Sequence, residues 1–111
     1  GDISSVSVDD VAGGRLAGQH LVATGRRRIA FLGGPLDIRQ VHDRLQGLQE
    51  VALQHDDVRV EIITGSNLSI LEGRRIGELI AGRPPRERPD AIFAANDLMA
   101  IGALQAFVMR G

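Results

Sequence analysis

Arg44 and Asn96 are the two residues whose chemistry best suits the binding of a small polar molecule. An arginine guanidinium presents several N–H donors in one plane, so it can bind hydroxyl groups or a carboxylate. An asparagine amide both donates and accepts hydrogen bonds, which suits the hydroxyl groups of a sugar. The alternative for Arg44 is a solvated position paired with Gln40 or Asp37. Asp97 is expected first to cap a helix through its side chain, with contact to a ligand as the alternative.

Reactive chemistry has little support in this sequence. Without cysteine or lysine, thiolate–zinc sites, a cysteine nucleophile, a P-loop lysine and Schiff-base chemistry are excluded. Ser66 and Ser69 have no neighbouring histidine–aspartate pair, and the histidines lack the spacing of metal ligands. The turn at residues 33–35 lacks the third glycine of a dinucleotide-binding loop, and its Pro35 lacks the N–H that a phosphate would use. We therefore expect neither an enzyme nor a bound cofactor or metal.

Composition indicates a folded protein of one domain or part of one. The chain has 111 residues, of which 43% are apolar and 24% are charged. The net charge of −1 does not suit a surface that binds nucleic acid. Its apolar runs are far shorter than the ~20 residues of a membrane span. No export signal is visible at residues 1–5.

The polar residues depend on a repeated strand–helix pattern. Apolar runs at residues 28–32, 58–63 and 90–95 predict strands, with a spacing of roughly 30 residues that matches a βαβ unit. Helical periodicity predicts helices over 9–25, 41–54, 71–80 and from Asp97 onward. In the last helix, one apolar stripe contains Leu98, Ile101, Leu104 and Val108. The sequence thus predicts a three-layer α/β fold, a parallel sheet with helices on both faces.

A parallel sheet gathers the chemically useful residues at one edge. Ligands of open α/β sheets lie beyond the carboxyl ends of the strands. Residues 33–37, 64–68 and 96–97 are expected there, with the Asp10 end of the first helix beside them. A sheet of only three strands has two unpaired edges, so we expect a piece of a larger fold, with an independent three-strand domain as the alternative.

Four segments resemble the LacI/GalR family of bacterial transcriptional regulators. They are residues 8–16, 20–35, 44–48 and 89–103, which occur in the family's order and spacing. The resemblance implies part of a periplasmic-binding-protein-like (type I) core, in which two α/β lobes hold an effector between them. Residues 1–8 would end the crossover from an N-terminal lobe. Residues 9–111 would form the C-terminal lobe, incomplete at its C-terminal end.

The same resemblance implies roles for individual residues. Arg44 and Asn96 match effector-contacting positions, with Gln40, Val8 and Asp97 as further ligand-binding candidates. Leu68 stands where the family often has an aromatic ring that stacks on the effector. The dimer interface is expected to include Ser69, Ile70, Gly73, Arg74, Ile101 and Gln105.

The expected function is effector sensing in a cytoplasmic, homodimeric, non-catalytic regulator. A small metabolite, sugar-like or of the nucleobase class, would bind between the lobes and change operator affinity. Operator DNA would be bound by a helix-turn-helix that this chain does not contain. The alternative is an extracytoplasmic sugar-binding receptor of a transport system, which shares the cleft but lacks the DNA-binding module.

Overall fold

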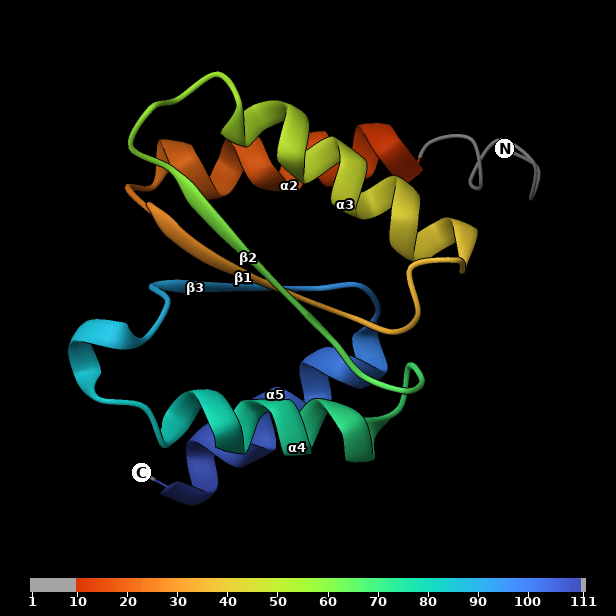
Figure 1. Ribbon diagram of the computed structural model, residues 1–111, viewed down its shortest axis with the longest axis vertical. Helices are drawn as coiled ribbons and strands as arrows, with labels where there is room; N and C mark the ends of the chain where they lie inside the picture. Colours follow the sequence, from red (N-terminus) through yellow and green to blue (C-terminus); the bar gives the residue numbers. More distant parts are fainter. Residues whose placement is uncertain (1–9, 111) are drawn as a thin grey trace.

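Strand β1 (Arg28–Gly33) forms the middle of the fold in the computed structural model, which describes residues 10–110. Its sequence, RIAFLG, has no polar side chain after Arg28, and all five of those positions are buried. A strand without a polar face is stable only when both faces are covered. Helices cover both faces here (Figure 1), as the sequence predicts.

Strands β2 (Arg59–Thr64) and β3 (Ala91–Ala94) pair in parallel with opposite edges of β1, in the order β2-β1-β3. The register places Phe31 of β1 between Ile62 and Phe93. The ring centroids of the two phenylalanines lie 5.5 Å apart. A helix separates consecutive strands along the chain, so the predicted three-layer α/β fold is confirmed.

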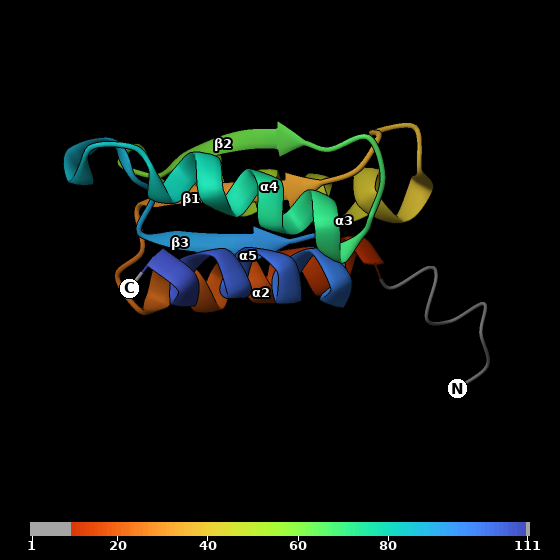
Figure 2. The same ribbon diagram turned by 90° about the horizontal axis from the view of Figure 1, so that it is seen from below.

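Two helices form each outer layer. Helices α2 (Asp10–Ala23) and α3 (Arg39–Ala52) cover one face, and α4 (Ile70–Ala81) and α5 (Asp97–Arg110) cover the other. A short 3-10 helix, η1 (Pro85–Glu87), lies between α4 and β3. Figure 2 shows the three strands side by side, with β2 and β3 at the edges.

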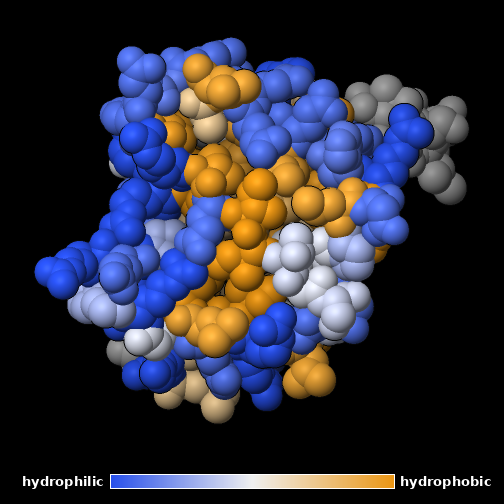
Figure 3. All heavy atoms as spheres, viewed as in Figure 1, coloured by the Kyte–Doolittle hydropathy of each residue, from blue (hydrophilic) through white to orange (hydrophobic). Residues whose placement is uncertain are grey.

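Successive side chains of β1 divide the core into two clusters. Ile29 and Phe31 pack with residues of α2 and α3, whereas Ala30 and Leu32 pack with residues of α4 and α5. In Figure 3, apolar atoms gather in the band between the two helical layers, and polar atoms lie along the outer helices. A single short strand, β1, therefore contributes side chains to both core clusters, because successive side chains of a strand point to opposite faces of the sheet.

The helices of each layer touch backbone to backbone at glycines. A Cβ on Gly14 of α2 would overlap the carbonyl oxygen of Arg44 in α3, and a Cβ on Gly47 of α3 would overlap the backbone of α2. Gly73 of α4 and Gly102 of α5 make equivalent contacts in the other layer. These contacts fix the position of each helix beside its neighbour, and they bring Arg44 next to the start of α2.

The apolar stripe of α5 points away from the sheet. Small and flexible residues face the sheet and α4, because the close approach of the two helices leaves room for little else: Met99, Gly102, Ala103 and Ala106. The large apolar residues are left outside and exposed: Leu98, Ile101, Leu104 and Val108.

The helices and strands lie within a few residues of their sequence-based positions. Residues 1–8, which are expected to end the crossover from an N-terminal lobe, lie outside the described residues. Across residues 10–110, no helix combines the length and the apolar character that crossing a membrane requires.

Gly14→Ala should destabilise the protein by about 1–3 kcal/mol, because the added methyl forces α2 away from α3. Gly13→Ala is the matched control: its Cβ would meet nothing within 4 Å. In the same helix, that change should be neutral or stabilise by up to about 1 kcal/mol. Urea unfolding of both variants measures the difference, and equal stabilities would contradict the packing described here.

Candidate functional site

The loops that follow the three strands meet at one edge of the sheet, which we call the carboxyl rim: residues 33–38, 64–69 and 95–97, with the first turn of α2. The strand ladder continues into these loops. The N–H of Gly65 donates to the carbonyl of Gly33, and the N–H of Ala95 donates to the carbonyl of Leu32, both at 2.7 Å. The rim loops are therefore held in register with the sheet.

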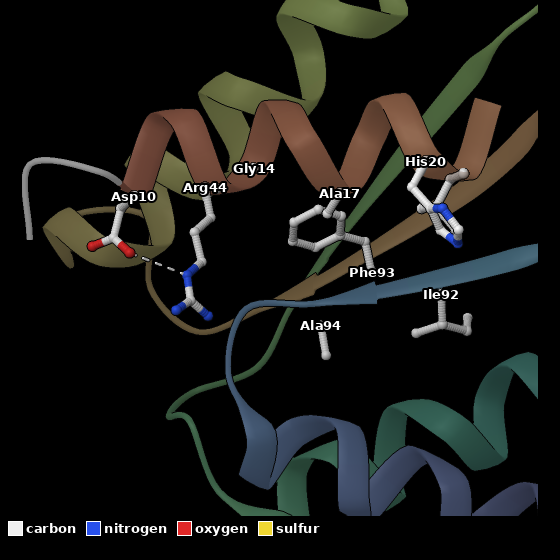
Figure 4. A pocket seen from close by; sticks show the side chains of 10 residues that line it. Asp10, Gly14, Ala17, His20, Arg44, Ile92, Phe93 and Ala94 are labelled. Atoms are coloured by element: carbon white, nitrogen blue, oxygen red, sulfur yellow. Dashed lines mark hydrogen bonds and ion pairs between the residues drawn. The ribbon is translucent and has the colours of Figure 1, made fainter. Parts of the chain in front are cut away.

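Arg44 joins three elements at this rim. Its Nε lies 3.4 Å from Oδ1 of Asp10 at the start of α2, and its Nη1 donates to the carbonyl oxygen of Ala95 after β3. The side chains are partly buried, with 31% of Arg44 and 13% of Asp10 exposed. Figure 4 shows the contact between them. Gln40 and Asp37, the partners that sequence suggests for a solvated Arg44, are not the ones it contacts. Asp10 takes that place because the glycine contacts bring α2 against α3.

Asn96 ties the end of β3 to the neighbouring loop. Its Oδ1 accepts a hydrogen bond from the N–H of Met99 at 2.9 Å, and its Nδ2 donates to the carbonyl of Leu68 at 3.5 Å. Asn96 is thus the residue that caps α5. The expectation that Asp97 is the cap is wrong: Asp97 is the first helical residue and is exposed. Its carboxylate instead lies in the first turn, where negative charge suits the helix dipole.

The loop between β2 and α4 is held by Glu72. Its carboxylate accepts hydrogen bonds from the N–H of Ser66 at 2.8 Å and from the Ser66 hydroxyl at 3.1 Å. Ser69 caps α4 by accepting from the N–H of Glu72. Arg75 and the Ser66 N–H lower the pKa of Glu72 to about 2. The serine–glutamate spacing at 69 and 72 is the sequence signal of a capping box, from which the Ser69 cap could have been predicted.

The remaining residues that the sequence predicts to contact a ligand lie in different surroundings. Gln40 is exposed in the first turn of α3, one turn before Arg44. Leu68 is half-buried and packs closely over Gly34, so its side chain partly completes the core at the rim. Val8 lies outside the described residues. At the rim, Arg44 donates to the carbonyl of Ala95, the residue before Asn96, so Arg44 and Asn96 lie close together. Gln40 and Leu68 lie at the margin of the rim.

A hollow of about 420 Å³ runs from the rim along the free edge of β3 (Figure 4). Asp10 and Arg44 line one end and His20 lines the other; the walls between are mainly apolar, with Ala17, Leu21, Ile92, Phe93 and Ala94. Ligand pockets usually combine apolar walls with a few polar groups that orient the ligand. The polar groups of the hollow lie at its two ends, and the mouth with Asp10 and Arg44 belongs to the rim.

The residues expected at a dimer interface divide into two groups. Ile70 and Ile101 are exposed, and Arg74 donates from Nη2 to Oε1 of Gln105 at 2.6 Å across the two helices. Gly73, by contrast, is buried and packs against the backbone of Met99 between α4 and α5. Ser69 is occupied as a helix cap. Three further residues line a hollow with Arg74 and Gln105 but were not predicted for the interface: Leu104, Val108 and Met109.

No cluster of three or more histidine, aspartate or glutamate side chains that could hold a metal ion occurs in the described part of the chain. The rim offers hydrogen-bond donors and acceptors that are fixed by their own contacts. Such an arrangement can bind and orient a polar molecule, which is the chemistry that its residues support.

Comparison with known proteins gives consistent matches. Residues 18–111 match the family described as periplasmic binding protein-like domain. The chain is 34% identical over 113 residues to the HTH-type transcriptional regulator CelR of Thermobifida fusca, covering 98% of this chain and 32% of the regulator.

Solved structures give the same result. A regulatory protein of the LacI family from Chloroflexus aggregans has a TM-score of 0.84 and 40% identity, over 93% of this chain and 37% of that one. A periplasmic solute binding protein of an ABC transporter from Actinobacillus succinogenes 130z, with bound D-allose, has a TM-score of 0.78 and 28% identity, over 93% and 36%. The chain spans about a third of the length of these relatives.

The rim loop held by Glu72 generates a pH-dependent prediction. Because the pKa of Glu72 is about 2 in the folded protein, against an ordinary 4.5, its carboxylate stabilises the fold above pH 4.5, and this stabilisation is lost as the pH falls toward 2. The difference in free energy of unfolding between the wild type and Glu72→Gln should therefore shrink over that range. Urea unfolding at several pH values measures it, with Glu78→Gln on the same helix as the control. A difference that stays constant from pH 6 to about 2 would contradict the assigned contact.

Proposed function

The chain belongs to the family of periplasmic binding protein-like domains, in the form that LacI-family regulators carry, and from this premise we propose that it senses a small effector for a DNA-binding transcriptional regulator. The observation that carries the proposal is the position of Arg44. Its guanidinium lies at the carboxyl rim, held by Asp10 and by the carbonyl of Ala95, and it is still partly exposed. N–H donors fixed in this way can bind ligand hydroxyls without first being ordered.

In this proposal, residues 9–111 form most of the C-terminal lobe, and residues 1–8 end the crossover from the other lobe. The outer edge of β3 and the hollow beside it would receive a further strand of the same lobe, because within residues 10–110 β3 pairs with β1 alone and the walls of the hollow are mainly apolar. The effector would bind between the lobes, touching Arg44 and Asn96, with Gln40, Leu68, Val8 and Asp97 around them.

The proposed mechanism is a shift between conformations and includes no catalytic step. An effector that binds the closed pair of lobes better than the open pair favours closure, and closure changes operator affinity through a helix-turn-helix elsewhere in the protein. A coupling free energy of about 1–3 kcal/mol is typical of such linkage. The regulator would act in the cytoplasm.

An exported sugar receptor is the second candidate, supported by the structural likeness to the D-allose-bound solute binding protein. Both functions use the same rim, so the geometry of the rim does not distinguish one function from the other. The full reading frame does: a helix-turn-helix before this domain identifies the regulator, whereas an export signal there identifies the receptor.

Arg44→Ala should abolish effector binding while the protein still folds, because it removes the donors at the rim. A thermal-shift screen of the intact protein against sugars, sugar phosphates and nucleobases identifies the effector, and calorimetric titration then measures its affinity. Arg59→Ala, at the opposite edge of the sheet, is the control and should bind as the wild type does. Unchanged affinity in Arg44→Ala would refute the role of Arg44.

We also propose that the outer face of α4 and α5 binds a second copy of the protein. This face contains Ile70, Arg74, Ile101, Leu104, Gln105 and Val108. Leu104 is 62% exposed and Ile101 is 44% exposed, and an exposed apolar strip on two helices is typical of an interface.

Ile101→Arg should convert the dimer to a monomer, because it buries an unpaired charge in the interface. Analytical ultracentrifugation of the intact protein measures the change. Leu53→Arg is the control, since Leu53 is 86% exposed in the other helical layer. If Ile101→Arg stays dimeric, or if both variants dissociate, this face is not the interface.

A further inference from the structure

Asp10 neutralises the arginine that faces the proposed effector. Its side chain is only 13% exposed, and its Oδ1 lies 3.4 Å from Nε of Arg44. Among residues 10–110, Arg44 is the only cation within ion-pair distance of Asp10. The close contact of Gly14 with the backbone of Arg44 keeps the two side chains together, because α2 and α3 cannot separate at this point.

Around Arg44, no other side chain of residues 10–110 at the rim offers an unpaired positive charge. Arg39, in the first turn of α3, pairs with Asp43 at 3.6 Å. Asp37 and Asp97 are exposed, and neither contacts an arginine in the part of the chain that the structure describes. The charged side chains of the described rim residues are therefore neutral to acidic in sum, and among them Arg44 presents hydrogen-bond donors to a ligand.

The guanidinium keeps its directional N–H groups while its charge is compensated. Nε faces Asp10 and Nη1 donates to the carbonyl of Ala95, which leaves N–H groups of the outer nitrogens available (Figure 4). Neutral hydroxyl oxygens can accept from these groups without approaching a like charge. A carboxylate or phosphate bound at the same place would lie beside the Asp10 carboxylate and be repelled.

We propose that Asp10 is a specificity-determining residue that makes this rim select a neutral polyhydroxylated ligand over its anionic analogue. The part of this proposal that concerns the selected ligand rests on the proposed effector function. The exclusion of anions at Arg44 is a property of the Asp10–Arg44 pair itself, and it can be measured without knowing the effector.

The first experiment measures anion binding directly, by equilibrium dialysis of radiolabelled sulfate against the intact protein. Asp10→Asn keeps the size and one hydrogen-bond acceptor of the side chain but removes its charge. It should bind sulfate at least about tenfold more tightly than the wild type, since the full charge of Arg44 becomes available. Asp10→Ser provides a second variant, because serine also suits the start of a helix.

Two controls make this result specific. Glu50→Gln removes the same charge from the other ion pair between α2 and α3, where Glu50 contacts Arg15 at 2.6 Å, and it should bind sulfate as the wild type does. Adding Arg44→Ala to Asp10→Asn should abolish the gain. The proposal is overturned if both Asp10 variants fold and neither gains affinity, if Glu50→Gln gains as much, or if the gain persists without Arg44.

The second experiment compares neutral aldoses with their uronic acids, which differ by one carboxylate on the same ring. Calorimetric titration of the intact wild type should favour the neutral member, and Asp10→Asn should reduce that preference at least about tenfold. A wild type that binds the uronic acid more tightly would overturn the proposal. If it binds neither member, the effector class in the proposed function is wrong, and the sulfate measurement still decides the role of Asp10.

Discussion

The binding chemistry proposed for the carboxyl rim depends on one contact, in which the guanidinium of Arg44 meets Asp10 and the carbonyl of Ala95. These partners come from α2 and from the end of β3, and Arg44 itself comes from α3. The contact exists because Gly14 and Gly47 allow the two helices to touch through their backbones. A side chain at either glycine would separate the helices, and Arg44 would lose the carboxylate that orients it. Packing between helices thus determines the chemistry of a surface site.

Much of the fold follows from the sequence because its signals are local. The apolar run of β1 predicts a buried central strand, and the regular spacing of strands predicts helical crossovers and a parallel sheet. The gathering of Arg44 and Asn96 at one edge then follows from topology alone. These features do not depend on which helix face is buried, so a single sequence is enough to predict them.

Other features depend on contacts between elements that are distant in sequence. The large apolar residues of α5 form a regular stripe, a pattern that is typical of the buried face of a helix. The glycine and alanines of α5 are buried instead, because α4 approaches too closely for leucine to fit. Local sequence equally suits Asn96 or Asp97 as the cap of α5, and the end of β3 decides in favour of Asn96. Asp10 and Arg44 are 34 residues apart, so no local pattern relates them.

The structure of the intact protein with its effector bound tests the central claim most directly. The account predicts that the ligand lies against the carboxyl rim, that its hydroxyl oxygens accept from the outer nitrogens of Arg44, and that Asp10 still faces Nε. A ligand bound elsewhere, or an Arg44 side chain turned away from the ligand and from Asp10, would contradict it.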